Sequence, residues 1–285
     1  MSILSVENIN ISVKDRVLLN NSHLQIDEGD VILLCGKNGS GKSTVIRTIM
    51  DDLPNSFKGL ASANITFNGY KIANENEKDR EFFNQNVCYI EQDDIFEANR
   101  VIDCCLASIS TIDSIENKIK YIFDFALKNG IYAVCFSNDE DVHLTVGNFL
   151  AKKILKSSGI SHKEATQEQL KTALFLSKNP THLSGGQRKM VNIFSNLVRY
   201  EYSSLCVIDE PLNALDFDNV RLFSNFLTTI HREKKSLGIL IVTHCRSIPC
   251  ITKMLKITEG EIIEITGERS CFSCFGNVNE YGYYE

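Results

Sequence analysis

The chain has 285 residues, 43% hydrophobic and 23% charged, a composition typical of a globular protein that buries one large core and can carry an inserted lobe. Its net charge of −6 and its scattered Lys and Arg residues argue against a broad basic face, so no nucleic-acid partner is expected. No apolar run approaches the roughly 20 residues of a membrane-spanning helix, and the N-terminus lacks the pattern of a secretory signal. Ten cysteines without such a signal favour free thiols in a reducing cytoplasm.

The first quarter of the chain has the apolar spacing of strands. Apolar residues over 4–13 predict a first strand, and a second apolar stretch over 17–26 follows a short polar turn. The continuous apolar run 31–35 predicts a strand that is buried on both faces of a sheet. This run ends in a glycine-rich loop, which leads into a helix pattern that begins near Lys42.

The rest of the chain combines a helical region with further buried strands. Between 93 and 183 the apolar residues recur mostly at helical spacing. The runs 205–208 and 239–242 predict two more buried strands, each followed by polar residues where its carboxyl end opens onto a site. A hairpin is predicted over 254–266, with its turn at Glu259-Gly260.

The loop after the run 31–35 carries a phosphate-binding motif, Gly36-Lys37-Asn38-Gly39-Ser40-Gly41-Lys42-Ser43-Thr44, which fits G-x-x-x-x-G-K-[ST]. Its glycines let backbone N–H groups converge on phosphate oxygens, and the following helix directs the positive end of its dipole at the same anion. Lys42 is expected to contact the β- and γ-phosphates of ATP, and the Ser43 hydroxyl is expected to ligate Mg²⁺. The strand–loop–helix context argues against a chance glycine turn.

A second glycine-rich segment, Leu183-Ser184-Gly185-Gly186-Gln187, resembles the signature of the ABC ATPases. In that family the signature closes over the γ-phosphate held by the opposite subunit. The resemblance implies that Ser184 and Gly186 of one copy contact ATP on the phosphate loop of the other, in a homodimer or in a heterodimer with a related ATPase. The predicted helix start at Gln187 suits a second anion site.

Other segments resemble the remaining ABC motifs, in the family's order. By this resemblance Asp209 holds Mg²⁺ through water, and Glu210 acts as general base or orients the attacking water. Asp216 ends the segment Asn213-Ala214-Leu215-Asp216, which matches the family's D-loop at the dimer interface. His244 matches the switch histidine that hydrogen-bonds the γ-phosphate, and Gln92 matches the glutamine that senses Mg²⁺. The resemblance covers residues from about 3 to about 265.

The sequence departs from the family pattern in two places. Family members carry an aromatic residue after the first strand that stacks on adenine, and the matching position here is Val13, so weaker nucleotide binding and less selectivity against GTP are implied. The helical region is also longer than in small members. Either 144–150 resembles the family's helix start and about 97–141 is an insertion, or the helix starts at Arg100 and the extra residues come later. The extra apolar residues are expected to form a small local core.

These observations predict an α/β fold with a P-loop core and a mostly parallel sheet, an N-terminal antiparallel β-subdomain and an inserted helical subdomain. The core would comprise 1–92 and 184–270, the helical lobe 93–183 and a tail 271–285. Cys271 and Cys274 in the tail have C-x-x-C spacing, which without a second pair is expected to be incidental.

The resemblance implies an ATPase that uses ATP and Mg²⁺ and energises a small bacterial-type exporter. It would lie at the cytoplasmic face of the membrane, held there by separate permease subunits. A soluble ABC ATPase of Fe–S cluster assembly is the alternative, and a hydrophobic or a soluble cluster-bearing partner would distinguish the two.

Overall fold

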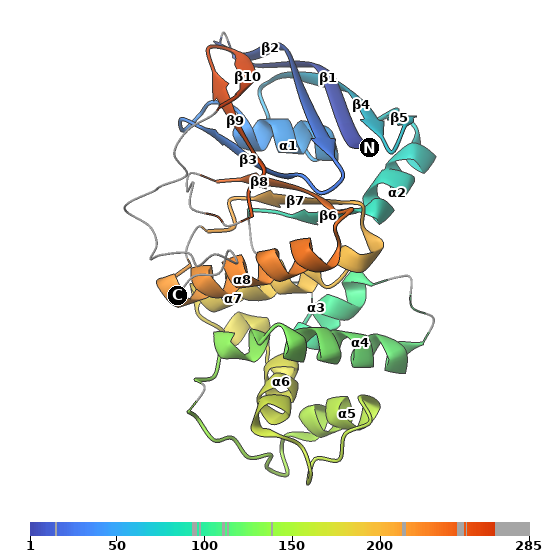
Figure 1. Cartoon of the computed structure of the whole chain (residues 1–285), viewed down its shortest axis with the longest axis vertical. Helices are drawn as coiled ribbons and strands as arrows, with labels where there is room; N and C mark the ends of the chain where they lie inside the picture. The colour runs from blue at the N-terminus through green and yellow to red at the C-terminus, as the bar shows by residue number, and fades with distance from the viewer. Residues whose placement is uncertain are drawn as a thin grey trace. The chain divides into compact units, whose positions relative to one another are not determined.

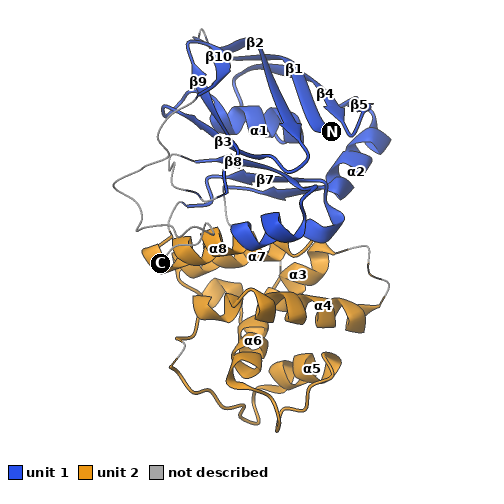
Figure 2. Cartoon of the chain, viewed as in Figure 1, with its two compact units in different colours: residues 1–92, 200–213, 227–285 blue, residues 93–199, 214–226 orange. Residues whose placement is uncertain are grey.

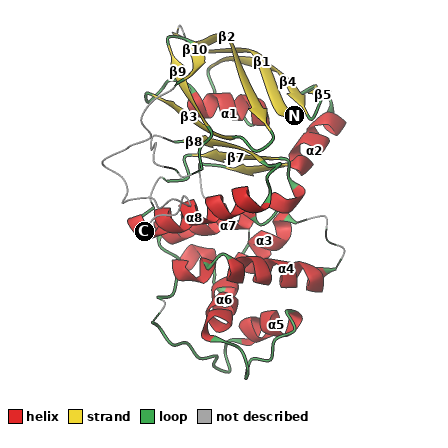
Figure 3. Cartoon of the chain, viewed as in Figure 1, coloured by secondary structure: helices red, strands yellow, loops and turns green. Residues whose placement is uncertain are grey.

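The computed structural model describes residues 1–14, 16–92, 96, 98–109, 112, 114–137, 139–212, 215–243, 248 and 250–265. The chain divides into two compact units, which are coloured separately in Figure 2. Unit 1 comprises 1–92, 200–213 and 227–285, and unit 2 comprises 93–199 and 214–226. The chain passes from unit 1 to unit 2 after Gln92. Residues 184–199, which the sequence analysis placed in the core, belong to unit 2 in this division. Among the described residues, every strand lies in unit 1 (Figure 3).

Unit 1 contains an antiparallel sheet with the strand order β2-β1-β4-β5 (Figure 1). Its strands are β1 (Ser2–Val13), β2 (Arg16–Asp27), β4 (Gly59–Phe67) and β5 (Tyr70–Ile72). In β2, Leu24 and Ile26 are buried, and His23 and Gln25 are exposed. This period-two pattern is typical of a sheet with one solvated face. The predicted strands at 4–13 and 17–26 are thereby confirmed.

The second sheet of unit 1 has the order β10-β9-β3-β8-β7-β6, in which every neighbouring pair is parallel except β10 and β9. Its strands are β3 (Val31–Gly36), β6 (Val87–Ile90), β7 (Leu205–Asp209), β8 (Gly238–Val242), β9 (Lys253–Thr258) and β10 (Glu261–Glu264). All residues of β7 and β8 are buried, as their continuous apolar runs predicted. The predicted hairpin is also present, and Glu259 and Gly260 form its turn with φ values of 52° and 85°.

Helix α1 (Lys42–Met50) contacts β1 and β4 of the first sheet and β3 and β7 of the second (Figure 1). Its apolar side chains Val45, Ile46 and Ile49 are buried in the core that the two sheets share. At the carboxyl end of α1, the guanidinium of Arg80 from α2 (Glu77–Asn86) donates hydrogen bonds to the Ile49 and Met50 carbonyls. These bonds satisfy backbone acceptors that the last turn of a helix leaves open.

The parallel register places the carboxyl ends of three strands at one edge of the sheet. Leu34 of β3 pairs with Val242 of β8, and Val242 pairs with Asp209 of β7. The loop that follows Gly36 leaves β3 at this edge. Ligands of open α/β sheets bind outside the carboxyl ends of the strands, so this edge is the expected place of a site.

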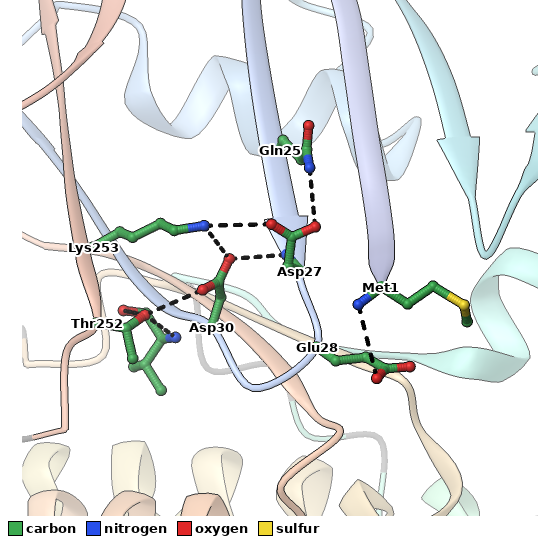
Figure 4. Close-up of polar contacts among 8 residues, drawn as sticks. Met1, Gln25, Asp27, Glu28, Asp30, Thr252 and Lys253 are labelled. Carbon is green, nitrogen blue, oxygen red and sulfur yellow. Dashed lines mark hydrogen bonds and ion pairs between the residues drawn. The ribbon is translucent and has the colours of Figure 1, made fainter.

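A polar network ties the opposite end of β3 to β2 and β9 (Figure 4). The Lys253 ammonium donates to Asp30 at 2.7 Å and to Asp27 at 3.5 Å, and the same Asp30 oxygen accepts from the Asp27 N–H at 2.9 Å. Hydrogen bonding to Asp30 raises the pKa of Lys253 above its ordinary value. A hydrogen bond from Gln25, joined by the charge of Lys253, lowers the pKa of Asp27. The network holds the starts of β3 and β9 together.

Unit 2 is helical. Its elements are α3 (Val101–Ser108), α4 (Ile115–Lys128), η1 (Ile131–Val134), α5 (Phe149–Ser157), α6 (Gln167–Ser177), η2 (Pro180–His182), α7 (Gly185–Leu197) and residues 217–226 of α8 (Phe217–Glu233). The remaining residues of α8 and the short turn η3 (Tyr200–Tyr202) belong to unit 1. A helix begins at each of the two alternative positions, since α3 follows Arg100 and α5 follows Asn148, so the place of the insertion stays a prediction.

The extra apolar residues of unit 2 form the expected local core, although Ile119 and Phe136 are only half-buried. Ile122, Phe123 and Phe125 of α4 are buried. The Phe125 ring lies 5.7 Å from the ring of Phe194 and 5.3 Å from that of Phe226, distances at which aromatic pairs stabilise a core. Within the described ranges, no helix is both long enough and apolar enough to cross a bilayer.

Candidate functional site

The loop between β3 and α1 is shaped by glycines. Gly39 and Gly41 have φ values of 72° and 101°, in the left-handed region that side chains with a Cβ rarely adopt. A Cβ at Gly36 would lie 2.7 Å from the Ser40 hydroxyl and 3.2 Å from the Ile257 carbonyl. Because these distances leave no room for a side chain, the loop can leave β3 in this conformation only with glycine at position 36. The loop therefore wraps tightly around the N-terminus of α1, where backbone N–H groups and the helix dipole favour an anion.

The phosphate loop holds polar groups that suit an anion. The Lys42 side chain is 6% exposed, and its ammonium donates to the carbonyls of Gly36 at 3.1 Å and Lys37 at 3.4 Å. The buried Ser40 hydroxyl has no hydrogen-bond partner among the described residues. Asn38 is exposed at the tip of the loop, and Thr44 is half-buried in the first turn of α1. The loop thus presents a cation and an unused hydroxyl, groups that phosphate oxygens can satisfy.

Ser43 and Asp209 meet although 166 positions separate them in the sequence. The Ser43 hydroxyl lies 3.1 Å from an oxygen of the Asp209 carboxylate, which is fully buried at the end of β7. Hydroxyl and carboxylate oxygens are ligands that Mg²⁺ accepts, directly or through water, beside the phosphates of a nucleotide. This donor set fits the predicted Mg²⁺.

The charge of Asp209 acts on a neighbouring side chain. Burial raises the pKa of the Tyr89 hydroxyl on β6, and the charges of Asp209 and Glu91 raise it further. The phenol therefore stays protonated. A divalent cation bound beside Asp209 would offset the charge of this carboxylate.

Glu210 directly follows β7 and has an uncommon backbone conformation. Its φ of 48° lies in the left-handed region, which costs a non-glycine residue roughly 1–2 kcal/mol. Its N–H donates to the Val242 carbonyl at 2.8 Å, and its side chain is 6% exposed. Strain of this kind persists where the surrounding structure holds it, and it concentrates at functional sites. β8 thus fixes the backbone of Glu210, which directly follows Asp209 in the sequence.

The predicted signature forms the start of α7 in unit 2. Ser184 caps the helix: its hydroxyl accepts from the Gln187 N–H at 3.3 Å, and the Gln187 side-chain oxygen accepts from the Ser184 N–H at 3.1 Å. Gly185 and Gly186 form the first turn. The Gln187 amide also donates to the Val134 carbonyl at 2.9 Å, which anchors the signature to η1. This is a second helix N-terminus that can receive an anion.

The other predicted site residues lie at several places. Gln92 is exposed just after β6, and Val13 is half-buried at the end of β1. The Asp216 carboxylate accepts from the Asn219 N–H at 2.8 Å at the start of α8. His244, residues 213–214 and the Cys271/Cys274 pair lie outside the described residues. The structure thus joins Ser43, Asp209 and the backbone of the phosphate loop, and it places the signature in the other unit.

Sequence reasoning missed two features. Arg80 clamps the carboxyl end of α1, and no motif signals this contact because its partners are backbone carbonyls. A cavity beside the phosphate loop is lined by Arg16 from β2 and Lys256 from β9. Arg16 and Lys256 are distant in sequence. They line the same cavity because β2 lies beside the β9–β10 hairpin in the fold.

Comparison with known proteins connects this geometry to one family. Residues 19–213 match the model of the ABC transporter family. The ergothioneine transport ATP-binding protein EgtV of Helicobacter pylori is 24% identical over 242 residues, covering 85% of this chain and 90% of that protein. The phosphonates import ATP-binding protein PhnC of Fusobacterium nucleatum is 24% identical over 262 residues, covering 92% and 91%. Several other relatives are longer, and the chain spans 32% to 41% of them.

A solved structure has the same fold. A dimeric bacterial ABC transporter cassette superposes with a TM-score of 0.63 and 17% identity, over 93% of this chain and 100% of that chain. The predicted fold class is confirmed by this likeness.

Proposed function

This chain belongs to the ABC transporter family, as its match over residues 19–213 shows, and we propose that it is the ATP-hydrolysing subunit of a transporter whose membrane-spanning chains are separate proteins. The observation that carries the proposal is the 3.1 Å contact between Ser43 and Asp209 beside the glycine loop that holds Lys42. This arrangement joins a phosphate cradle, the Lys42 ammonium and a pair of oxygen ligands at one edge of the sheet.

In this proposal the residues of unit 1 bind the triphosphate and the metal. The loop N–H groups and the Lys42 ammonium hold the β- and γ-phosphates, and Ser43 with Asp209 holds Mg²⁺. When bound there, Mg²⁺ would supply positive charge that offsets the charge of the phosphates. Glu210 accepts a hydrogen bond from the attacking water and orients it towards the γ-phosphorus, and His244 and Gln92 complete the contacts to the γ-phosphate and the metal. Positioning and charge neutralisation supply most of the rate enhancement.

The second half of the site comes from another copy of the chain or from a related ATPase. The N-terminus of the partner copy's α7, with its signature serine and glycines, would close over the γ-phosphate, and the D-loop that ends at Asp216 would run along the interface. The capping box of Ser184 and Gln187 supports this role because it holds the first turn of the helix in a fixed conformation. ATP binding would close the pair, and loss of phosphate would reopen it.

Unit 2 offers a surface for the membrane-spanning partner. Val146 and Phe149 are 94% and 75% exposed, and they flank Asn148 in sequence. Asn148 lines a cavity of about 400 Å³ together with Phe136, Leu174 and Leu183. Large apolar side chains exposed beside a cavity are typical of a protein–protein contact. We infer that a segment of the permease docks here, which would place the chain at the cytoplasmic face of the membrane.

The direction of transport is a separate question. A small bacterial exporter is the role predicted from the sequence, and export stays a prediction. Among the relatives described above, the name of PhnC gives a direction, and it is import. We therefore carry import as the second candidate. Uptake and efflux in reconstituted vesicles decide between them.

The transport role is tested by detergent extraction with the tagged chain as bait, in its native host. The wild type is expected to retain a membrane-spanning chain, and Phe149→Asp is expected to lose it while keeping the ATPase rate of the isolated subunit. Ile115→Asp is the matched control, because Ile115 is 65% exposed in the same unit and does not line the cavity. Capture of a soluble, cluster-bearing chain in place of a membrane-spanning one would favour the Fe–S assembly alternative and contradict the proposal.

A further inference from the structure

A cavity of about 780 Å³ adjoins the phosphate loop within unit 1. One wall is the start of β2, a second is the loop itself at Lys37, Asn38 and Ser40, and the third is the turn between β9 and β10. This volume is within the range of sites that hold small ligands. The first wall touches the loop closely: a Cβ at Gly41 would lie 3.5 Å from the side chain of Leu18. The cavity therefore continues directly from the phosphate cradle.

The cavity is lined mainly by polar and charged groups. Arg16, Lys37 and Lys256 contribute positive charge, and Glu259 contributes one carboxylate. Arg16 is exposed, and within the part of the chain that the structure describes its side chain forms no ion pair or hydrogen bond. An arginine with no structural partner on the wall of a cavity is available to a ligand.

Arg16 carries a planar guanidinium on this wall. The described residues of the β1–β2 hairpin around it, Val13, Lys14, Val17 and Leu18, include no aromatic ring. A guanidinium plane stacks on aromatic faces and nucleobases, and its charge adds a cation–π attraction. Lysine carries the same charge without the plane.

We propose that Arg16 contacts the base of the nucleotide whose phosphates occupy the loop 36–44, by stacking its guanidinium on the purine. This inference rests on the proposed ATP-binding function and identifies how the same site holds the base. A stacked guanidinium attracts either purine, and the cavity offers both donors and a carboxylate to the base edge. Discrimination between ATP and GTP is therefore weak, within about fivefold in dissociation constant.

The test measures dissociation constants for Mg·ATP, Mg·GTP and Mg·tripolyphosphate by calorimetry. Arg16→Ala is expected to weaken both nucleotides about three- to tenfold and to leave tripolyphosphate unchanged. Arg16→Lys should resemble Arg16→Ala, and Arg16→Tyr should bind ATP nearly as well as the wild type because it restores a stacking plane. Lys14→Ala removes a cation from the same hairpin outside the cavity and should change nothing.

Three results would overturn the inference: unchanged nucleotide binding by Arg16→Ala, an equal loss for tripolyphosphate, or wild-type affinity in Arg16→Lys. The last two would make Arg16 a general cation near the phosphates. If the wild type binds tripolyphosphate and ATP, and Arg16→Ala changes neither affinity, the base contact alone is refuted. A wild type that binds neither ligand refutes the proposed function itself. Because Arg16 is exposed, thermal unfolding of each variant should match the wild type, which separates a lost contact from misfolding.

Discussion

The Ser43 hydroxyl lies 3.1 Å from the Asp209 carboxylate, and this contact joins the first turn of α1 to the last residue of β7. Neither residue is near the other in sequence, and the parallel sheet brings them together. β3 and β7 both flank β8, so their carboxyl ends share one edge. The same edge holds the loop with Lys42 and the strained backbone of Glu210. A hydroxyl, an ammonium group and two acidic residues are thus brought to one edge by the order of three strands.

Removal of the Ser43 hydroxyl tests the metal site. Ser43→Ala should weaken the apparent affinity for Mg²⁺ and lower turnover by about 10- to 100-fold, because one of the oxygen ligands is lost. ATP binding in EDTA should stay close to the wild type. Titration of activity against Mg²⁺ measures the effect. Thr48→Ala is the control, since that hydroxyl bonds the Thr44 carbonyl within α1 and faces no phosphate. Equal Mg²⁺ dependence in Ser43→Ala and the wild type would exclude Ser43 as a ligand.

Two substitutions separate the carboxylate of Glu210 from its backbone. Glu210→Gln keeps the shape and should lower turnover by at least about 100-fold, because a neutral amide polarises the attacking water less than a carboxylate does and cannot take up its proton. Glu210→Gly should be equally inactive but more stable by up to about 1 kcal/mol, since glycine relieves the left-handed strain. Steady-state hydrolysis and urea unfolding give the two readouts. Near-wild-type turnover in either variant would remove Glu210 from catalysis.

Much of unit 1 could be predicted from the sequence because its signals are local. The runs 31–35, 205–208 and 239–242 are buried on both faces and are therefore continuously apolar, and the glycine loop has a fixed motif. β4 and β5 were not predicted. The first six residues of β4 are exposed or half-buried, so its start at Gly59-Leu60-Ala61-Ser62 shows no clear apolar alternation. Pairing with β1, which is distant in sequence, stabilises this strand.

The candidate site was predictable only in part. The motifs located Lys42, Ser43 and Asp209, but not the 3.1 Å contact, which depends on strand order. The left-handed backbone of Glu210 has no sequence signal, since glutamate rarely adopts it. The role of Gln187 as a link to η1 was also missed, because its acceptor is a backbone carbonyl. Groups that act through the backbone leave no pattern of side-chain types.

Arg80 should stabilise the helix that carries the phosphate loop. Arg80→Met keeps most of the side-chain length but leaves the carbonyls of Ile49 and Met50 without their donor. The free energy of unfolding should fall by about 1.5–3 kcal/mol, the range for hydrogen bonds to a charged group. Chemical unfolding measures this loss, and Lys78→Met on the exposed face of α2 serves as the control. Unchanged stability of Arg80→Met would show that the clamp contributes nothing to the fold.

The network around Lys253 predicts a pH dependence of stability. The pKa of Lys253 is raised in the folded protein, so its contribution is present at neutral pH and is lost as pH rises through the folded value. The pKa of Asp27 is lowered, so its contribution is present above the ordinary aspartate value and is lost as pH falls. Lys253→Met should therefore cost about 1 kcal/mol near neutral pH and progressively less at both extremes.

Thermal unfolding of the wild type and of Lys253→Met over a pH series tests this expectation. Lys71→Met, on the exposed strand β5, is the matched control and should follow the wild type at every pH. A difference between wild type and Lys253→Met that stays constant from acid to alkaline pH would contradict the linkage to Lys253 and Asp27.

The central claim is that the phosphate loop of one copy and the α7 N-terminus of another meet on one ATP, and the mass of the hydrolysis-deficient protein tests it most directly. Light scattering of Glu210→Gln with saturating Mg·ATP should give twice the chain mass of 32.1 kDa, and the mass should return to 32.1 kDa without nucleotide. Adding Ser184→Glu should prevent the doubling, because a carboxylate would face the γ-phosphate. A mass that stays at 32.1 kDa while calorimetry shows bound Mg·ATP would contradict the account.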